Sequence, residues 1–222
     1  LIGCFDHSGS ASIDHTARFN YILDMGNVPA KIDDNFNDNL LSSNWTIMNA
    51  SRAFIYETTG GTLEVISNSA ASQFWNATLT GPHFYPQLVT GDFSIETKAT
   101  ISGFASSNVG FHFFARDNAS LTNYVSICIY YSTTLGGLAV NVFSTLNGVS
   151  STLATEINAA GQTEIYFKIE RISNFFKLFY KFTSGGNWIE AAGVYRSAFG
   201  SIARICVGVT GGGTSPKVRA LV

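Results

Sequence analysis

Charged residues are scarce in this chain of 222 residues, since Asp, Glu, Lys and Arg together make up only 13% of it. The net charge of −2 leaves no excess of positive charge to attract phosphate groups, so nucleic acid is not an expected partner. Long apolar runs are also missing. The segment from Tyr124 to Tyr131 is well short of the roughly 20 residues that a membrane helix requires, and we expect no membrane span.

Cysteine is rare as well, and Cys4, Cys128 and Cys206 cannot all pair within one chain. Cys128 and Cys206 lie in apolar alternating segments, where a free thiol packs as a small hydrophobic group. Two reduced packing cysteines or one bridge both fit this pattern. The spacing of Cys4, His7 and His15 matches no closed zinc site, so we expect no metal and no cofactor.

Glycine and phenylalanine are abundant, with 21 and 18 residues, which favours strands and turns. No window combines helical spacing of apolar residues with capping residues, and this argues against a parallel sheet with helical crossovers. From Asp33 onward apolar and polar residues alternate between closely spaced turn clusters. The pattern predicts an all-β fold, a two-sheet antiparallel β-sandwich over residues 32–222. Residues 1–31, broken by Gly26 and Pro29, are predicted to be an N-terminal arm or linker.

Alternation within the strands predicts which side chains face the core. In segment 109–116, Phe111 and Phe113 fall on one face with other apolar residues, whereas His112 and Arg116 fall on the other. Segments 165–170 and 175–182, joined at Ser173-Asn174, form a predicted antiparallel hairpin. The predicted core includes Phe111, Phe113, Ile127, Ile169, Leu178 and Val207.

Several segments follow one another in an order similar to that of a known superfamily. Asp33 to Leu40, followed by Trp45, resembles the opening of concanavalin-A-like lectin/glucanase domains. Segments 91–97, 109–117, 123–127, 166–171 and 179–180, before Asn187-Trp188, resemble the branch that includes the C-terminal β-sandwich domain of β-xylosidases. The resemblance covers residues 33–222 and implies a concanavalin-A-like jelly roll.

The resemblance also implies how the domain ends. Family members close with an Asp-x-Phe/Tyr step, whereas this chain reads Lys217 to Val222 there, which implies truncation at the last strand. In laminarinase-like relatives a calcium ion ties the opening acidic segment to that closing Asp. Since the closing Asp is missing, Asp33 and Asp34 are expected to form a solvated acidic turn rather than a calcium site.

Catalytic strings of this superfamily are absent. Retaining glycosidases need two carboxylates about 5 Å apart, which relatives supply from a Glu-x-Asp-x-x-Glu strand. This sequence has no such string, and it also lacks the paired strands of alginate lyases. Glu96 and Glu170 are predicted to be surface residues or members of cross-strand ion pairs. We therefore expect no enzymatic activity and assign no catalytic residue.

A ligand site is predicted on the face of the sheet opposite the core. His112, Phe114, Arg116, Tyr124 and Tyr130 place aromatic rings and hydrogen-bond donors there. Sugars bind by stacking on such rings and by hydrogen bonding to such donors, so His112, Arg116, Tyr124 and Tyr130 are the predicted ligand-binding residues. The alternative is that a second layer, the N-terminal arm or a neighbouring subunit covers these rings. Trp75 and Trp188 lie near turns and fit either a rim contact or the edge of the core.

Two classes of function compete. The first is a non-catalytic glycan-binding or adhesion module of a larger secreted, surface or phage-tail protein. The second is a structural subunit or decoration protein of a virion or surface filament, in which the aromatic face and residues 1–31 contact other subunits. Both place the protein outside the cell, at the cell surface or in a virion. The Asn-x-Ser/Thr sequons at Asn44, Asn49, Asn76 and Asn118 permit glycosylation in an exported protein.

Overall fold

The computed structural model describes residues 45–58, 62–67, 74–75, 78–81, 83–85, 88–102, 104, 109–211 and 219–221. The predicted arm at residues 1–31, the Cys4, His7 and His15 group, the acidic pair Asp33 and Asp34, and the sequons at Asn44 and Asn76 lie outside the described residues. None of the described residues forms a helix long and apolar enough to cross a membrane.

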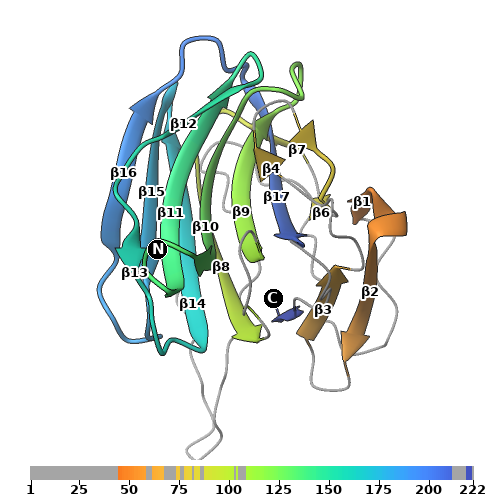
Figure 1. The fold of residues 1–222 in the computed structure, drawn as a ribbon. Coiled ribbons are helices and arrows are strands. Elements are labelled where there is room, and N and C mark those ends of the chain that lie inside the picture. Colours follow the sequence, from red (N-terminus) through yellow and green to blue (C-terminus); the bar gives the residue numbers. More distant parts are fainter. Residues whose placement is uncertain are drawn as a thin grey trace, which may run out of the picture.

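Two antiparallel sheets pack face to face (Figure 1). The nine-stranded sheet has the order β1-β6-β17-β9-β10-β11-β12, with β7 beside β17 and β13 beside β11. Its strands are β1 (Thr46–Met48), β6 (His83–Tyr85), β7 (Leu88–Thr90), β9 (Gly110–Asp117), β10 (Tyr124–Ser132), β11 (Gly137–Leu146), β12 (Val149–Thr152), β13 (Ile157–Asn158) and β17 (Ile202–Thr210).

The seven-stranded sheet has the order β16-β15-β14-β8-β18-β3-β2, so the last strand, β18, lies between β8 and β3. Its strands are β2 (Ala53–Thr58), β3 (Thr62–Ser67), β8 (Phe93–Ser102), β14 (Glu164–Ile172), β15 (Phe175–Lys181), β16 (Ile189–Tyr195) and β18 (Arg219–Leu221). A separate short pair comprises β4 (Phe74–Trp75) and β5 (Thr78–Leu79), and η1 (Ala50–Arg52) is a single 3-10 turn. The predicted two-sheet antiparallel sandwich is confirmed.

The core lies between the two sheets, as alternation predicted. All six predicted core residues are buried, with Val207 the most exposed at 7%. The rings of Phe111 on β9 and Phe167 on β14 stack across the interface, with centroids 6.2 Å apart. Burying one such ring contributes about 1.5–3 kcal/mol. The buried apolar side chains between the two sheets therefore stabilise the sandwich.

The predicted hairpin is also present. β14 and β15 pair from Tyr166↔Lys181 to Ile172↔Phe175. Ser173 takes a positive φ of 56° in the connecting turn, and its N–H donates to Asp92 Oδ1 at 2.6 Å. The turn is thereby fixed to the start of β8, which is the other strand that pairs with β14.

Both described cysteines are free and buried, so the bridged alternative is wrong. Cys128 lies on β10 and Cys206 on β17, and β9 separates these strands. Neighbouring strands are about 4.8 Å apart, which puts the two Cα atoms beyond the roughly 7 Å that a disulfide can span. Burial raises the pKa of each thiol to about 12, which keeps both protonated at neutral pH.

Candidate functional site

The four predicted ligand-binding residues lie on one surface, the outer face of the nine-stranded sheet. We use this name for the face turned away from the seven-stranded sheet. His112 and Arg116 are on β9, and Tyr124 and Tyr130 are on β10, which is its neighbour. Tyr124 is the direct cross-strand partner of Arg116. The strand register therefore brings these residues onto the same face, as predicted.

A row of polar side chains crosses this face near the loops that connect β9 to β10 and β11 to β12. The register aligns one residue from each of five adjacent strands, and we call them the polar row: Arg204 on β17, Arg116 on β9, Tyr124 on β10, Thr145 on β11 and Ser150 on β12. The Thr145 and Ser150 hydroxyl oxygens are 2.6 Å apart. Burial raises the pKa of Tyr124, so its hydroxyl stays protonated. The row offers hydroxyl and guanidinium donors of the kind that bind sugar hydroxyls.

The loops at this end are fixed to one another by backbone hydrogen bonds. The Asn147 N–H donates to Asn123 Oδ1 at 2.7 Å, and the Gly148 N–H donates to the Thr122 carbonyl at 3.1 Å. Asn147 and Gly148 both have positive φ, which suits the tight turn between β11 and β12. These bonds hold the ends of β9, β10 and β11 in register and thus position the polar row.

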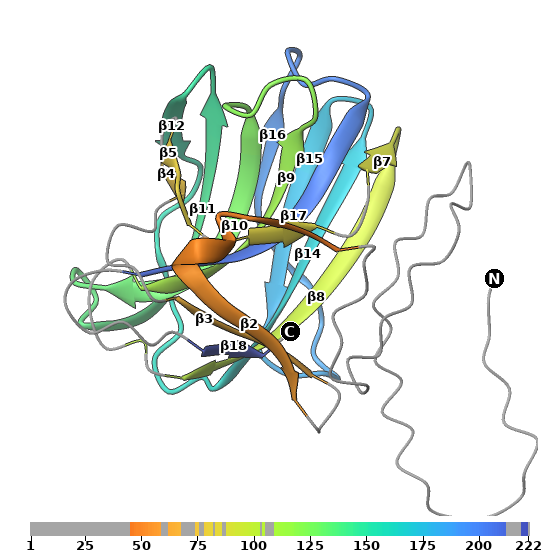
Figure 2. The ribbon, with the colours of Figure 1, turned by 90° about the vertical axis from the view of Figure 1, so that its right-hand side faces the viewer.

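The prediction that the four residues form an open surface is wrong for three of them. The relative exposed areas are 7% for His112, 1% for Arg116 and 1% for Tyr124. Part of the cover is the β4–β5 pair, which Figure 2 shows beside β12. The Phe74 ring centroid lies 5.0 Å from that of His112 and 5.1 Å from that of Phe114. Alternation assigns a residue to a face, but it does not show what packs over that face.

Tyr130 is partly exposed, but its hydroxyl is already engaged. It donates to Glu156 Oε1, and the Ser132 hydroxyl donates to Glu156 Oε2 at 2.6 Å. Burial raises the pKa of Tyr130, and the hydrogen bond to Glu156 raises it further. Since the phenol is held in this way, Tyr130 presents its ring rather than its hydroxyl, and its role in ligand binding remains a prediction.

Two guanidinium groups lie side by side in the polar row, because Arg116 and Arg204 are direct cross-strand partners. The Arg116 Nη1 lies 3.3 Å from His83 Nε2, whereas its Nε and Nη2 are buried without a hydrogen-bond partner. Arg204 donates through Nε to Asn118 Oδ1 at 2.8 Å and through Nη1 to the Tyr85 hydroxyl at 2.7 Å. Among the described residues, every hydrogen-bond partner of the two cations is therefore neutral.

Both histidines of the outer face are held in the neutral state. Burial lowers the pKa of His83 to about 4 and that of His112 to about 3. The His83 Nδ1 lies 2.9 Å from the Gly81 carbonyl, so Nδ1 carries the proton and Nε2 accepts from Arg116. Protonated His83 would place an N–H against the guanidinium, which explains why Arg116 also lowers this pKa.

Trp75 is the exposed aromatic ring of this region, with 41% of its area accessible. It packs on Phe143 of β11 at 5.2 Å between ring centroids, and Phe143 in turn contacts Tyr124 at 6.0 Å. Trp75 thus stands at the rim of the outer face, two ring contacts from the polar row. The rim interpretation of Trp75 fits this position better than the core-edge interpretation.

Several residues of this region were not predicted from the sequence. Arg204 was within reach of the alternation argument, because Ala203, Ile205 and Val207 on β17 face the core and Arg204 alternates with them. His83 and Tyr85 lie on β6, a strand of only three residues, which is too short for a periodicity signal.

The outer face of the seven-stranded sheet carries a different pattern, a ladder of lysines over aromatic rings. Lys168 Nζ lies 4.3 Å from the Phe179 ring centroid and 5.2 Å from that of Trp188. Lys181 Nζ lies 4.6 Å from the Trp188 centroid and 5.3 Å from that of Tyr166. An ammonium group thus already occupies a face of each ring, which leaves less of the ring free for a sugar to stack on.

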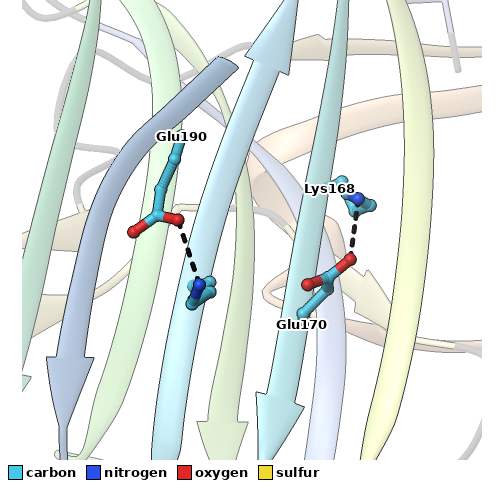
Figure 3. A network of polar contacts seen from close by, with 4 residues as sticks. Lys168, Glu170 and Glu190 are labelled. Carbon is cyan, nitrogen blue, oxygen red and sulfur yellow. Dashed lines mark hydrogen bonds and ion pairs between the residues drawn. The ribbon is translucent and has the colours of Figure 1, made fainter. Parts of the chain in front are cut away.

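The charges of this ladder are largely paired (Figure 3). Lys168 and Glu170 form an ion pair at 2.7 Å, and Lys177 and Glu190 form one at 3.2 Å. Lys98 pairs with a glutamate in the same way. Glu170 is therefore an ion-pair residue, but its partner lies two residues away on the same strand, β14, rather than on a neighbouring strand as the sequence predicted.

Carboxylates are scarce on the described strands of the nine-stranded sheet, which carries the candidate site. The strands of the nine-stranded sheet contain one acidic residue, Asp117, and its Oδ1 accepts from the Ala119 N–H at 3.0 Å. A pair of carboxylates in glycosidase geometry is thus not available from these strands. Within the described ranges, no group of three or more potential metal ligands comes together.

No family model and no curated protein matches this sequence. Solved structures are similar to it nonetheless. The GH43 protein BlXynB from Bacillus licheniformis matches with a TM-score of 0.65 and 18% identity, over 85% of this chain and 37% of that protein. The xylan beta-1,4-xylosidase from Bacillus halodurans C-125 matches with a TM-score of 0.66 and 12% identity, again over 85% and 37%.

A smaller protein with a similar fold is the carbohydrate-binding module CBM66 from Bacillus subtilis. It matches with a TM-score of 0.50 and 14% identity, over 80% of this chain and 91% of the module. The chain thus spans 37% of the length of the two larger proteins but nearly all of this module. At these identities the similarity shows the fold. That fold agrees with the concanavalin-A-like sandwich that the resemblance of the sequence implied.

Proposed function

We propose that this chain is a non-catalytic carbohydrate-binding module that acts outside the cell. One observation carries the proposal: the Trp75 ring, 41% exposed, stands at the rim of the outer face and is linked through the Phe143 ring to Tyr124 of the polar row. The C–H groups of a sugar ring stack on an exposed indole, while hydroxyls and guanidinium groups bind its oxygens. Similarity to a structure named as a carbohydrate-binding module supports this assignment.

Within this proposal the residues predicted from the sequence take different roles. Arg116 and Tyr124 belong to the polar row and are each only 1% exposed, so the proposal has them meet the ligand from beneath the partly exposed Arg204 and Ser150. His112 and Tyr130 line the same face, where one contacts Phe74 and the other contacts Glu156. The proposal therefore assigns Arg116 and Tyr124 to contacts with the glycan, and His112 and Tyr130 to packing within the outer face. The described residues offer no observation that specifically favours the alternative, a virion or filament subunit that binds other subunits.

The absence of a catalytic role in this proposal rests on the composition of the nine-stranded sheet. Its strands bring only Asp117 as a carboxylate, and the nearby Glu156 is hydrogen-bonded to Tyr130 and Ser132. Glycoside hydrolysis needs an acid and a second carboxylate on opposite sides of the scissile bond. We accordingly expect no release of reducing sugar from any polysaccharide that the protein binds.

Trp75→Ala is expected to lower saccharide affinity by about tenfold or more, because it removes the stacking ring. The melting temperature should change little, since the indole is substantially exposed. The measurement is a glycan array to find a ligand, followed by calorimetric titration and a thermal melt of each variant.

Trp188→Ala provides the matched control on the other sheet, because it removes an indole that lies between two lysines. Its affinity should stay within twofold of the parent. If Trp188→Ala abolishes binding and Trp75→Ala does not, the site lies on the seven-stranded sheet and the proposed location is wrong. If the array and the titrations detect no saccharide, the proposed function is wrong.

A further inference from the structure

The arginine pair of the polar row is electrostatically unusual. Like charges directly opposite one another on paired strands destabilise a sheet, since their Cβ atoms lie about 4.5–5.5 Å apart. Arg116 and Arg204 have this arrangement. Both retain their charge, because guanidinium does not deprotonate in proteins. The fold thus holds two positive charges together on the outer face.

No described carboxylate contacts either guanidinium. Three lysines of the other sheet have a glutamate partner within 3.2 Å. Arg171, which is also buried, has four hydrogen-bond acceptors. By comparison, Arg116 is only 1% exposed, and its Nε and Nη2 have no hydrogen-bond acceptor among the described residues. A buried cation without an anion and with orphan donors lowers stability, so its presence needs an explanation.

An anionic ligand would supply what the pair lacks. Guanidinium groups match the planar geometry of a carboxylate or the oxygens of a sulfate, and such charge-assisted hydrogen bonds are stronger in a water-poor site. Arg204 is partly exposed and lies over the Tyr85 ring, with its Cζ 4.8 Å from the centroid, so it can meet a ligand first. Arg116 beside it provides the two free N–H groups.

We propose that the Arg116–Arg204 pair binds the acidic group of an acidic saccharide, either the carboxylate of a uronic acid or a sulfate ester. This inference rests on the proposed carbohydrate-binding function and names the ligand class. Ser150, the partly exposed hydroxyl at the far end of the same row, binds a neutral hydroxyl of the ligand. Trp75 stacks on an adjoining sugar ring at the rim.

Matched saccharides test the inference by calorimetric titration of the whole chain. Oligogalacturonate is compared with its methyl ester, and chondroitin sulfate with desulfated chondroitin, while a neutral galactan oligomer serves as reference. At least one acidic saccharide should bind about tenfold or more tightly than its uncharged or desulfated counterpart. If esterification removes the tighter binding, the arginine pair recognises a carboxylate. If desulfation removes it, the pair recognises a sulfate ester.

Variants of Arg116 and Arg204 test whether these two residues cause the preference for acidic saccharides. Arg204→Gln and Arg116→Met should each reduce acidic-saccharide affinity about tenfold or more, which is a larger factor than either variant costs in affinity for the neutral galactan. Lys181→Met is the control, because it removes a cation from the seven-stranded sheet. The Lys181 ammonium donates to the Ser184 carbonyl and to no other described acceptor.

The two proposals fail in different ways. Equal binding of acidic and neutral saccharides, or unchanged acidic binding in both arginine variants, overturns the acidic-ligand inference and leaves the carbohydrate-binding function standing. If none of these saccharides and no glycan of the array binds, both proposals are overturned.

Discussion

Lowering the pH from 7 to 5 is expected to reduce the free energy of unfolding by about 4 kcal/mol. The cause is the pair of buried histidines on the outer face. In the folded chain the pKa is about 4 for His83 and about 3 for His112, against an ordinary value of 6.5. Each unit of pKa difference corresponds to about 1.4 kcal/mol, and each histidine contributes about 2 kcal/mol over this pH range.

The sign follows from proton binding. Between pH 6.5 and the folded pKa, the unfolded chain binds a proton at each histidine that the folded chain does not. Acidification therefore favours unfolding, and the stability that is present above pH 6.5 is lost as the pH falls toward 4. In the fold, a proton on His83 would face Arg116, and a proton on His112 would lie among the rings of Phe74 and Phe143.

Thermal melts or urea titrations at pH 7, 6 and 5 measure this effect, and the melting temperature should fall by roughly 10 °C across the range. The double variant His83→Asn and His112→Gln is the control. Asn can still donate to the Gly81 carbonyl, and Gln can still reach Thr210. Its stability should vary far less between pH 7 and 5. If the double variant retains the full pH dependence, the histidines are not the cause.

Arg171→Met is expected to lower the free energy of unfolding by at least about 3 kcal/mol, which corresponds to roughly 6–12 °C in melting temperature. The Arg171 guanidinium donates to the carbonyls of Ser173, Gly200 and Ser201 and to Asn174 Oδ1. It thereby connects the β14–β15 turn to the loop before β17. Methionine keeps most of the packing but leaves these acceptors without their donor.

Arg116→Met is the matched comparison, because Arg116 is as deeply buried as Arg171 but poorly partnered. Its removal eliminates two orphan donors and an unpaired charge at the expense of one contact to His83. We expect the free energy of unfolding to change by less than about 1 kcal/mol or to rise. Chemical denaturation of both variants tests the contrast. Equal, large destabilisation would mean that Arg116 is a structural residue.

The fold was largely predictable because alternation is a strong signal in long strands. β9, β10, β14 and β15 are seven residues or longer, and their inward residues, such as Phe113 and Ile169, are buried as predicted. The same signal failed to show that the outer face is covered. Part of the cover comes from β4 and β5, two strands of two residues each, which are too short to carry a periodicity signal.

The candidate site was only partly predictable for a related reason. Arg116 and Tyr124 were identified because they lie on adjacent long strands, whereas Arg204 comes from β17, a strand distant from both in sequence. The pairing of Arg204 with Arg116 joins positions that are far apart along the chain, and register between such strands is set by packing rather than by local sequence. The importance of Trp75 depends on its contact with Phe143, which is a tertiary contact.

The central claim is that a saccharide binds the outer face of the nine-stranded sheet. Titration of isotope-labelled protein with a saccharide from the array, followed by amide and indole NMR shifts, tests it most directly. The account predicts the largest shifts at the Trp75 indole N–H and at the amides of Tyr124, Thr145 and Ser150. Largest shifts at Tyr166, Phe179 and Trp188, with the polar row unchanged, would contradict it.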